Sequence, residues 1–448
     1  MSKAQMHNRF SNMRFIAVCL CICAAIALHA QAPNPSQAAP DKDRQLKFVV
    51  IVSRHGVRSP TAKPGQFDPY SRQPWPVWSV PPGYLTEHGA RLMTIFGAFD
   101  REQLAAQGLL APTGCDAAEH IRIVADSDQR TRETANALAA GLAPGCSVPV
   151  TALPEGTPDP LFHSIEAKIG QPDKLLATAA VSGRIGANPR EFAEAYRPQL
   201  EALEAVLQSC PTGVPCSESK TPTQSIFDIP ASIAPGKKDH LVEFRSPLSV
   251  ASTMSENLLL EYTEGMEASK VGWGRVDGDK LREILQLHTA SEGIVQRTSY
   301  IARAQSSNLL LHLLQSMQQA VDAHPVTGAL TQPGDRLLIL VGHDTNLANI
   351  GGALSLSWLI DGRRDDTPPG GALVFELWKR NDLPAYSVHV YYTAQTLDQM
   401  RNATPLSLKT PPERVPVFVP GCSQADQSCD WAAFEATLKS AIETEFTK

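Results

Sequence analysis

The sequence predicts an α/β fold in which a mostly parallel sheet is flanked by helices and interrupted by an inserted, mainly α-helical domain. Three continuous apolar runs, residues 45–52, 121–125 and 336–341, are typical of strands buried on both faces. Each run meets a polar cluster and then a segment with helical character, and this alternation indicates a parallel sheet. We therefore expect a discontinuous α/β domain at residues 33–157 and 324–448, and a helical insertion at residues 158–323.

The remaining elements follow from helical and strand-like patterns. Thr86 opens an amphipathic run that continues to about residue 107, with Leu92, Phe96 and Phe99 on one side. A patch rich in Pro, Ser and Lys, residues 211–238, is expected to be disordered. Helices are predicted at residues 189–208, 249–263, 279–291, 296–320 and 431–447, and further strands at residues 148–153, 372–378 and 386–392.

The first 32 residues have the composition of a secretory signal peptide. Three basic residues precede an apolar run, residues 15–28, and a small-residue cleavage pattern then allows cleavage after Ala30 or after Ala32. The apolar run is too short for a typical transmembrane helix, although a membrane anchor is the alternative interpretation. The segment predicts a periplasmic or secreted protein that has no membrane contact after cleavage.

The net charge bears on the class of ligand, and the cysteine content bears on the cellular compartment. The formal net charge is −6, and no basic stripe supports nucleic-acid binding. Of the nine cysteines, those at positions 19, 21 and 23 lie in the signal peptide, and the even number that remains indicates disulfides in an exported protein. Many pairings are possible, and a metal site is the rival interpretation, but local spacing favours Cys115 with Cys146, Cys210 with Cys216, and Cys422 with Cys429.

Charged clusters follow the three buried strands. Ligands of open α/β sheets bind at the carboxyl ends of the strands, so clusters that are far apart in sequence can converge there. Buried arginines without acidic partners are costly unless an anion completes the site, and guanidinium groups match phosphate oxygens in bidentate geometry. The sequence therefore predicts a phosphate-binding pocket formed by Arg54, His55, Arg58, Arg130, His343 and Asp344.

Two of these residues have the chemistry of phosphoryl transfer. His55 lies between two arginines, whose charge lowers the pKa of the imidazole and keeps a neutral nitrogen available as a nucleophile. Asp344 can protonate a departing alkoxide, although an aspartate in that place is also a good helix N-cap. We expect no metal or other cofactor, because the sequence has no Walker-type phosphate loop and no recognisable acidic metal-binding cluster.

The segment RHGVRSP, residues 54–60, together with GHDTN, residues 342–346, resembles the histidine acid phosphatases, and more narrowly their bacterial periplasmic branch of acid phytases and glucose-1-phosphatases. The similarity extends from about residue 45 over the rest of the chain. It implies a phosphohistidine intermediate on His55 and a proton donor in Asp344, without a metal. It also implies that the phosphate is held by Arg54, Arg58, Arg130 and His343.

The resemblance also bears on the substrate. The HDTN form of the second motif and Arg275 are more similar to the phytase members, and Thr61 and Glu256 match positions of their substrate pocket. Ala62 departs from that pattern, because those members carry a lysine there, and Lys63 lies one place further along. We expect a monomeric enzyme acting on a small phosphate ester, namely phytate (myo-inositol hexakisphosphate). The alternatives are a glucose-1-phosphatase, a broad-specificity sugar-phosphate phosphatase, and a phosphate-ester binding protein without catalysis.

Overall fold

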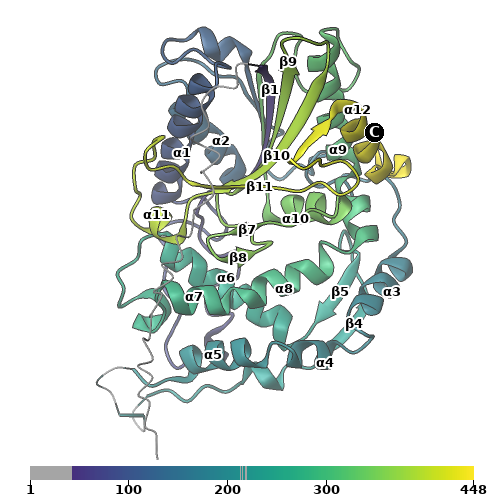
Figure 1. Ribbon diagram of the computed structural model, residues 1–448. Coiled ribbons are helices and arrows are strands. Elements are labelled where there is room, and N and C mark those ends of the chain that lie inside the picture. Colours follow the sequence, from purple (N-terminus) through teal and green to yellow (C-terminus); the bar gives the residue numbers. More distant parts are fainter. Residues whose placement is uncertain (1–42, 212, 214, 217–218) are drawn as a thin grey trace, which may run out of the picture. The chain divides into compact units, whose positions relative to one another are not determined.

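The computed structural model describes residues 43–448 except residues 212, 214 and 217–218 (Figure 1). The predicted signal peptide and both of its cleavage positions lie outside the described residues. Within residues 43–448, apart from the four omitted positions, no helix combines the length and the apolar character needed to cross a membrane.

A central sheet carries the parallel strands that the sequence predicts. β1 (Arg44–Arg54) pairs in parallel with β6 (Leu337–Gly342), which pairs in parallel with β2 (Ile121–Ala125), and β3 (Val150–Thr151) follows beyond β2. The α/β prediction is confirmed, although the strand predicted at residues 148–153 is only two residues long. Antiparallel strands extend the sheet on the other side of β1: β9 (Ala372–Arg380), β10 (Tyr386–Ala394), and then β11 (Glu413–Pro416) and β12 (Ser428–Asp430), which both pair with β10.

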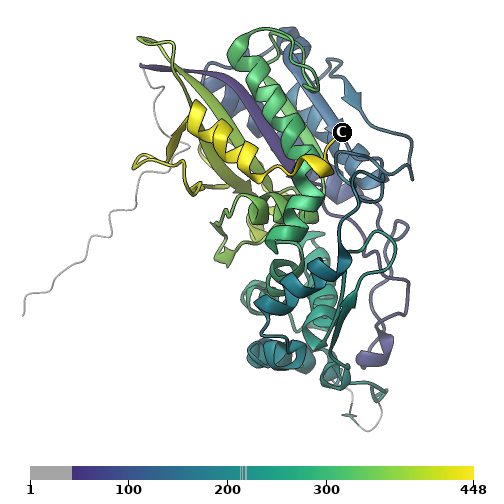
Figure 2. The same ribbon diagram turned by 90° about the vertical axis from the view of Figure 1, so that its right-hand side faces the viewer.

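Helices cover both faces of this sheet (Figures 1 and 2). Alternate residues of β1 point to opposite faces, as the two-residue period of a strand requires. Val49 and Ile51 share one apolar cluster with α1 (Glu87–Ala106) and α2 (Gln129–Leu142). Val50 and Val52 share another with α9 (Ser299–Asp322), α10 (Asp344–Ala353) and α12 (Trp431–Ala441). Because both faces are covered, β1 is apolar throughout rather than alternating.

The middle of the chain is mainly helical. The run predicted at residues 189–208 divides into two helices, the second of which has Pro198 in its first turn, and the run at 279–291 divides at Leu285. The first helix of the region, α3 (Lys174–Arg184), was not predicted. The region continues with α4 (Pro189–Glu194), α5 (Arg197–Gln208), α6 (Pro247–Thr263), α7 (Gly278–Ile284) and α8 (Gln286–Val295), and ends with α9.

The expectation of disorder at residues 211–238 is wrong for the second half of that patch. Ile226 begins a short 3-10 helix and is fully buried in the apolar cluster around α6. β4 (Ser232–Pro235) pairs with β5 (Val242–Arg245) in a small antiparallel hairpin. Composition suggested disorder because single apolar residues among Pro, Ser and Lys give no periodic signal, yet a few of them are enough to fix the chain against a core. The predicted domain boundaries stay a prediction.

Several short elements and the disulfides complete the description of the fold. The closing helix ends at Ala441, earlier than predicted, and a 3-10 turn follows at Thr444–Phe446. A short hairpin of β7 (Leu359–Ile360) and β8 (Arg363–Arg364) precedes β9, and α11 (Leu397–Arg401) follows β10. The disulfides have the pairing that spacing favours, with Cα–Cα distances of 5.4 Å for Cys115–Cys146, 5.3 Å for Cys210–Cys216 and 5.1 Å for Cys422–Cys429.

Candidate active site

The end of β1 places His55 between two neighbouring strands. The backbone N–H of His55 donates to the carbonyl of Gly342 at the end of β6, at 2.9 Å. On the other side, the carbonyl of His55 accepts from the N–H of Gly370, also at 2.9 Å, just before β9. Gly56 must stay small, because a Cβ there would lie 2.8 Å from the Cγ of Met93. The backbone of His55 is thus held in place by the ends of two neighbouring strands.

The hydrogen bond of the His55 ring defines which nitrogen is free. Nδ1 lies 2.8 Å from the carbonyl oxygen of Gly56, which can only accept, so Nδ1 carries the hydrogen and Nε2 keeps its lone pair. Burial lowers the pKa of His55 well below its ordinary value, and the charges of Arg130, Arg54 and Arg58 lower it further. The sequence predicted the effect of the arginines, and the structure adds burial as the larger cause. A neutral imidazole with an accessible pair of electrons is the form that a nucleophile requires.

The three predicted segments meet around this ring. The ring centroids of His55 and His343 are 5.6 Å apart, and the Nη2 atom of Arg54 lies 2.8 Å from Asp344. Arg130 approaches from α2 and donates through Nη2 to Nδ1 of His343 at 3.3 Å. Residues separated by almost 300 positions therefore form one group, as the strand-end argument requires.

The assumption that the arginines lack acidic partners is wrong. Arg54 is completely buried, pairs with Asp344 and with Glu256 of α6, and donates to the carbonyl of Thr367 at 2.6 Å. Arg58 also pairs with Glu256, at 3.1 Å. Arg130 pairs with Asp128 at 2.6 Å. The sequence could not reveal Glu256 as a partner, because it lies on a helix about 200 residues away. An anion that binds to these arginines would therefore share them with the carboxylates that already pair with them.

Removing Glu256 should expose the cost of these buried charges. We expect Glu256→Ala to lower the free energy of unfolding by about 3 kcal/mol, because Arg54 and Arg58 lose a buried partner. Inorganic phosphate should restore part of the loss, since it supplies another anion to the folded state. Urea unfolding with and without phosphate measures both effects, with exposed Glu267→Ala as the control. An unchanged midpoint in Glu256→Ala would contradict the structural role of the ion pair.

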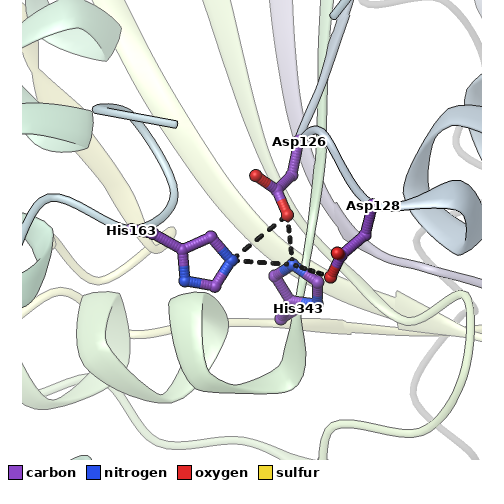
Figure 3. A group of neighbouring side chains, drawn as sticks. All are labelled: Asp126, Asp128, His163 and His343. Atoms are coloured by element: carbon purple, nitrogen blue, oxygen red, sulfur yellow. Dashed lines mark hydrogen bonds and ion pairs between the residues drawn. The ribbon is translucent and has the colours of Figure 1, made fainter. Parts of the chain in front are cut away.

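Four side chains form a connected group beside the arginines (Figure 3). Nε2 of His343 lies 2.7 Å from Oδ2 of Asp126, and Nε2 of His163 lies 3.2 Å from the same oxygen. Asp128 is at the edge of the group, 3.8 Å from His343. Because Arg130 donates to Nδ1 of His343, Nε2 of that ring carries the hydrogen and donates to Asp126. Asp126 therefore fixes the orientation of the His343 ring.

This group has the composition of a metal site, and so has a second group made of Glu256, His288 and Asp344; within each, the ligand atoms lie within 4.8 Å of one another. Hydrogen bonds and ion pairs account for the first group, because a cation would have to displace the proton on Nε2 of His343 and the donor from Arg130. In the second group Arg54 pairs with both carboxylates. We therefore assign both groups to hydrogen bonding and charge pairing.

Asp344 begins α10, at the end of β6. Burial alone would raise the pKa of its carboxyl group, but the charges of Arg54, His288 and Arg58 outweigh burial and hold the pKa below its usual range. His288 comes from α8 and bonds through Nδ1 to the hydroxyl of Ser252, at 3.1 Å. Without a ligand, Asp344 is ionised. His288 and His163 were missed in the sequence, since neither lies in a motif or at the end of a strand.

Two of the residues predicted to contact the rest of the substrate, Thr61 and Arg275, lie in different parts of the structure. Thr61 is exposed in the loop after the first motif. Next to it lies a cavity of about 430 Å³, which is lined by Ser59, Lys63, Trp75, Trp78 and Asn257 among others. Arg275 donates to the carbonyls of Val206 and Cys210 at 3.0 and 3.2 Å. These contacts hold the guanidinium group of Arg275 against the end of α5 and the residues that follow it, and its contact with substrate stays a prediction.

A profile of the histidine phosphatase superfamily (branch 2) matches residues 45–212 and 245–393. The chain belongs to this family. It is 37% identical over 417 residues to phytase AppA of Escherichia coli (strain K12), covering 90% of this chain and 94% of that protein. It is 30% identical over 412 residues to the glucose-1-phosphatase of Providencia rettgeri, covering 90% of this chain and 93% of that protein. The Hafnia alvei phytase in complex with myo-inositol hexakis sulphate has a TM-score of 0.80 and 34% identity, covering 91% of this chain and all of that one.

Proposed function

We propose that the protein is an acid phosphatase that hydrolyses phytate through a phosphohistidine intermediate. The observation that carries the proposal is the environment of Nε2 of His55. This nitrogen is unprotonated, because Nδ1 donates to Gly56, and the ring is buried among Arg54, Arg58 and Arg130. A nucleophile among fixed positive charges is what transfer of a phosphoryl group requires.

In the first half of the reaction, Nε2 of His55 forms a bond to phosphorus while the bond to the ester oxygen breaks. That oxygen takes a proton from Asp344 and leaves as an alcohol, and Arg54, Arg58 and Arg130 hold the remaining phosphate oxygens. His343 joins them when its Nδ1 atom carries a proton instead of accepting from Arg130. In the second half, Asp344 accepts a proton from a water molecule, whose oxygen attacks phosphorus. The bond from phosphorus to nitrogen breaks, and phosphate and neutral His55 are regained.

The ionised state of Asp344 in the free site is compatible with this role. Its pKa is low because Arg54, His288 and Arg58 outweigh the effect of burial. A bound phosphate ester adds negative charge beside the same arginines, so their hold on the carboxylate weakens and its pKa rises. Asp344 then gains a proton when substrate binds under acidic conditions, which is the moment when the leaving oxygen needs one.

Several findings favour phytate over a simple sugar phosphate. Phytase AppA shares more residues with this chain than the glucose-1-phosphatase does, 37% against 30%. The cavity beside Ser59 offers a lysine, Lys63, and two indole rings, Trp75 and Trp78, next to the first motif. Lys63 supplies one positive charge for a further phosphate of the substrate, beside the carboxyl groups of Asp68 and Glu261 in the same lining. Arg275 is not part of this argument, because its two hydrogen bonds go to the carbonyls of Val206 and Cys210.

A substrate profile tests the proposal. We expect kcat/KM for phytate to exceed that for glucose 1-phosphate by at least about tenfold in mild acid, a difference of about 1.4 kcal/mol in transition-state binding. Measuring phosphate release from both esters over pH, with and without EDTA, gives the comparison, and EDTA should change neither rate. If glucose 1-phosphate is preferred tenfold, the enzyme is a sugar-phosphate phosphatase. If neither ester is hydrolysed although phosphate binds, the protein is a phosphate-ester binding protein.

The location and assembly of the protein are also proposals. Three disulfides are consistent with a location outside the cytoplasm, and together with the predicted signal peptide they support a periplasmic or secreted enzyme. Size-exclusion chromatography with light scattering tests the expected monomer.

A further inference from the structure

His163 lies in the connection between β3 and α3, on a segment that is held against the end of β6. The backbone N–H of His163 donates to the carbonyl of Asp159 at 2.7 Å, and Asn346 of α10 donates to the carbonyl of Phe162 at 2.9 Å. A Cβ on Gly342 would lie 2.7 Å from the ring of Phe162, so the segment and the strand end are in close contact. The backbone of His163 therefore has a defined position beside the phosphate-binding residues.

The ring of His163 shares one carboxylate oxygen with His343. Oδ2 of Asp126 lies 2.7 Å from Nε2 of His343 and 3.2 Å from Nε2 of His163, and the two nitrogens are 3.3 Å apart (Figure 3). A lone pair on His163 would repel this oxygen, so Nε2 of His163 carries a hydrogen and donates. The side chain is 34% exposed and lines a small cavity with Asp239 and His240. Its Nδ1 atom can therefore gain a proton without loss of the bond to Asp126.

The charges around His163 favour the imidazolium form. Burial would lower the pKa of His163, but the hydrogen bond and charge of Asp126, with Asp128 and Glu166, outweigh it and raise the pKa above its ordinary value. Arg130 brings a positive charge to the same group, because it pairs with Asp128 and donates to His343. The titratable groups that interact with the ring are Asp126, Asp128, Asp159, Glu166 and His343, and Asp239 and His240 line the same cavity.

We propose that His163 is a positioning residue, which in its charged form fixes Asp126 and so holds the His343 ring toward the substrate phosphate. The proposal rests on the proposed function of the site. It explains why a second histidine lies where the arginines are already paired with Glu256, Asp344 and Asp128. The imidazolium adds a positive charge beside Asp126, a carboxylate that it shares with His343 and not with an arginine. It acts on the bound ligand through this charge and through the orientation of the His343 ring. As pH rises and the proton leaves, phosphate binding weakens.

The test is a pH series with three variants. His163→Asn removes the charge but keeps a polar side chain, and His163→Lys keeps a positive charge at higher pH. His324→Asn is the matched control, because His324 is exposed beyond the end of α9. We expect His163→Asn to raise KM for a phosphate ester about tenfold in mild acid, with a smaller change in kcat. The ratio of wild-type to variant kcat/KM should fall toward one as pH rises, and the lysine variant should stay active to higher pH.

A ratio that stays constant with pH would overturn the proposal, because a merely structural role gives a uniform loss. A ratio of one at every pH would overturn it too. Thermal unfolding checks that the variants are folded, and if His163→Lys is not, the pH dependence of the asparagine variant decides. Calorimetry of inorganic phosphate binding over the same pH range needs no turnover. It therefore tests His163 even if the protein hydrolyses no ester, which separates this proposal from the proposed function.

Discussion

His55→Ala should lower the rate of phosphate release by at least about 10⁴-fold, because no other side chain can replace the nucleophilic Nε2 atom. Binding of inorganic phosphate should persist, since Arg54, Arg58 and Arg130 keep their positions. The fold should also persist, because the backbone of residue 55 is held by hydrogen bonds to Gly342 and Gly370 that do not involve the imidazole. Turnover measurements, calorimetry with phosphate and thermal unfolding give the three readouts.

Trapping the intermediate makes this prediction specific. After mixing with a labelled phosphate ester and quenching in alkaline denaturant, the wild-type chain should carry label that is stable to base and labile to acid, and His55→Ala should carry none. His324→Ala, at an exposed position, is the control and should be labelled like wild type. Label of the same kind in His55→Ala would place the phosphoryl group on another residue.

Asp344→Asn should separate esters by their leaving groups. An alkoxide needs a proton from the enzyme, whereas p-nitrophenolate leaves without one, and general acid catalysis contributes about 10²-fold to 10⁴-fold. We expect kcat/KM to fall at least about 100-fold for an alkyl phosphate, and less than about tenfold for p-nitrophenyl phosphate. The comparison uses kcat/KM because this constant reports the steps up to the phosphoenzyme, and the later hydrolysis also depends on Asp344.

A control variant and a binding measurement test whether the effect of Asp344→Asn is specific to proton donation. Exposed Asp382→Asn, a change of the same chemistry at a distant ion pair with Arg380, should leave both esters unaffected. The asparagine can still accept a hydrogen bond from Arg54, so the site should keep its shape and its affinity for phosphate. Equal losses on both esters would remove Asp344 from the role of proton donor and leave it a charge partner of Arg54.

The fold could be predicted where burial is uniform. Residues 45–52 and 336–341 are apolar without interruption because helices cover both sides of β1 and β6, and this signal needs no knowledge of distant contacts. Interruptions were harder to foresee. The break between α7 and α8 at Leu285 leaves the apolar periodicity intact, so no sequence pattern marks it. The edge strands β11 and β12 were missed because short strands at the edge of a sheet carry little apolar pattern.

The site could be predicted only where function concentrates polar residues after a strand. Arg54, His55 and Asp344 stand out for that reason. Glu256 and His163 do not, because one is a charged residue on a helix and the other a single histidine in a connecting segment. Their contacts with Arg54 and Asp126 depend on how distant segments pack, which periodicity does not report. Glu256 was predicted from the resemblance to contact substrate, and that role stays a prediction; the structure adds its ion pairs with Arg54 and Arg58.

The two hydrogen bonds that join residue 55 to the ends of β6 and β9 have a consequence for how such an enzyme can diversify. The residue that carries the reacting atom is held on both sides by the central sheet, so little reorganisation energy is needed when phosphorus approaches. New preferences for one ester over another must then arise in surrounding loops, such as the segment with Trp75 and Trp78, whose remodelling leaves the sheet undisturbed. Natural or laboratory selection for other substrates should therefore produce substitutions mainly in these loops.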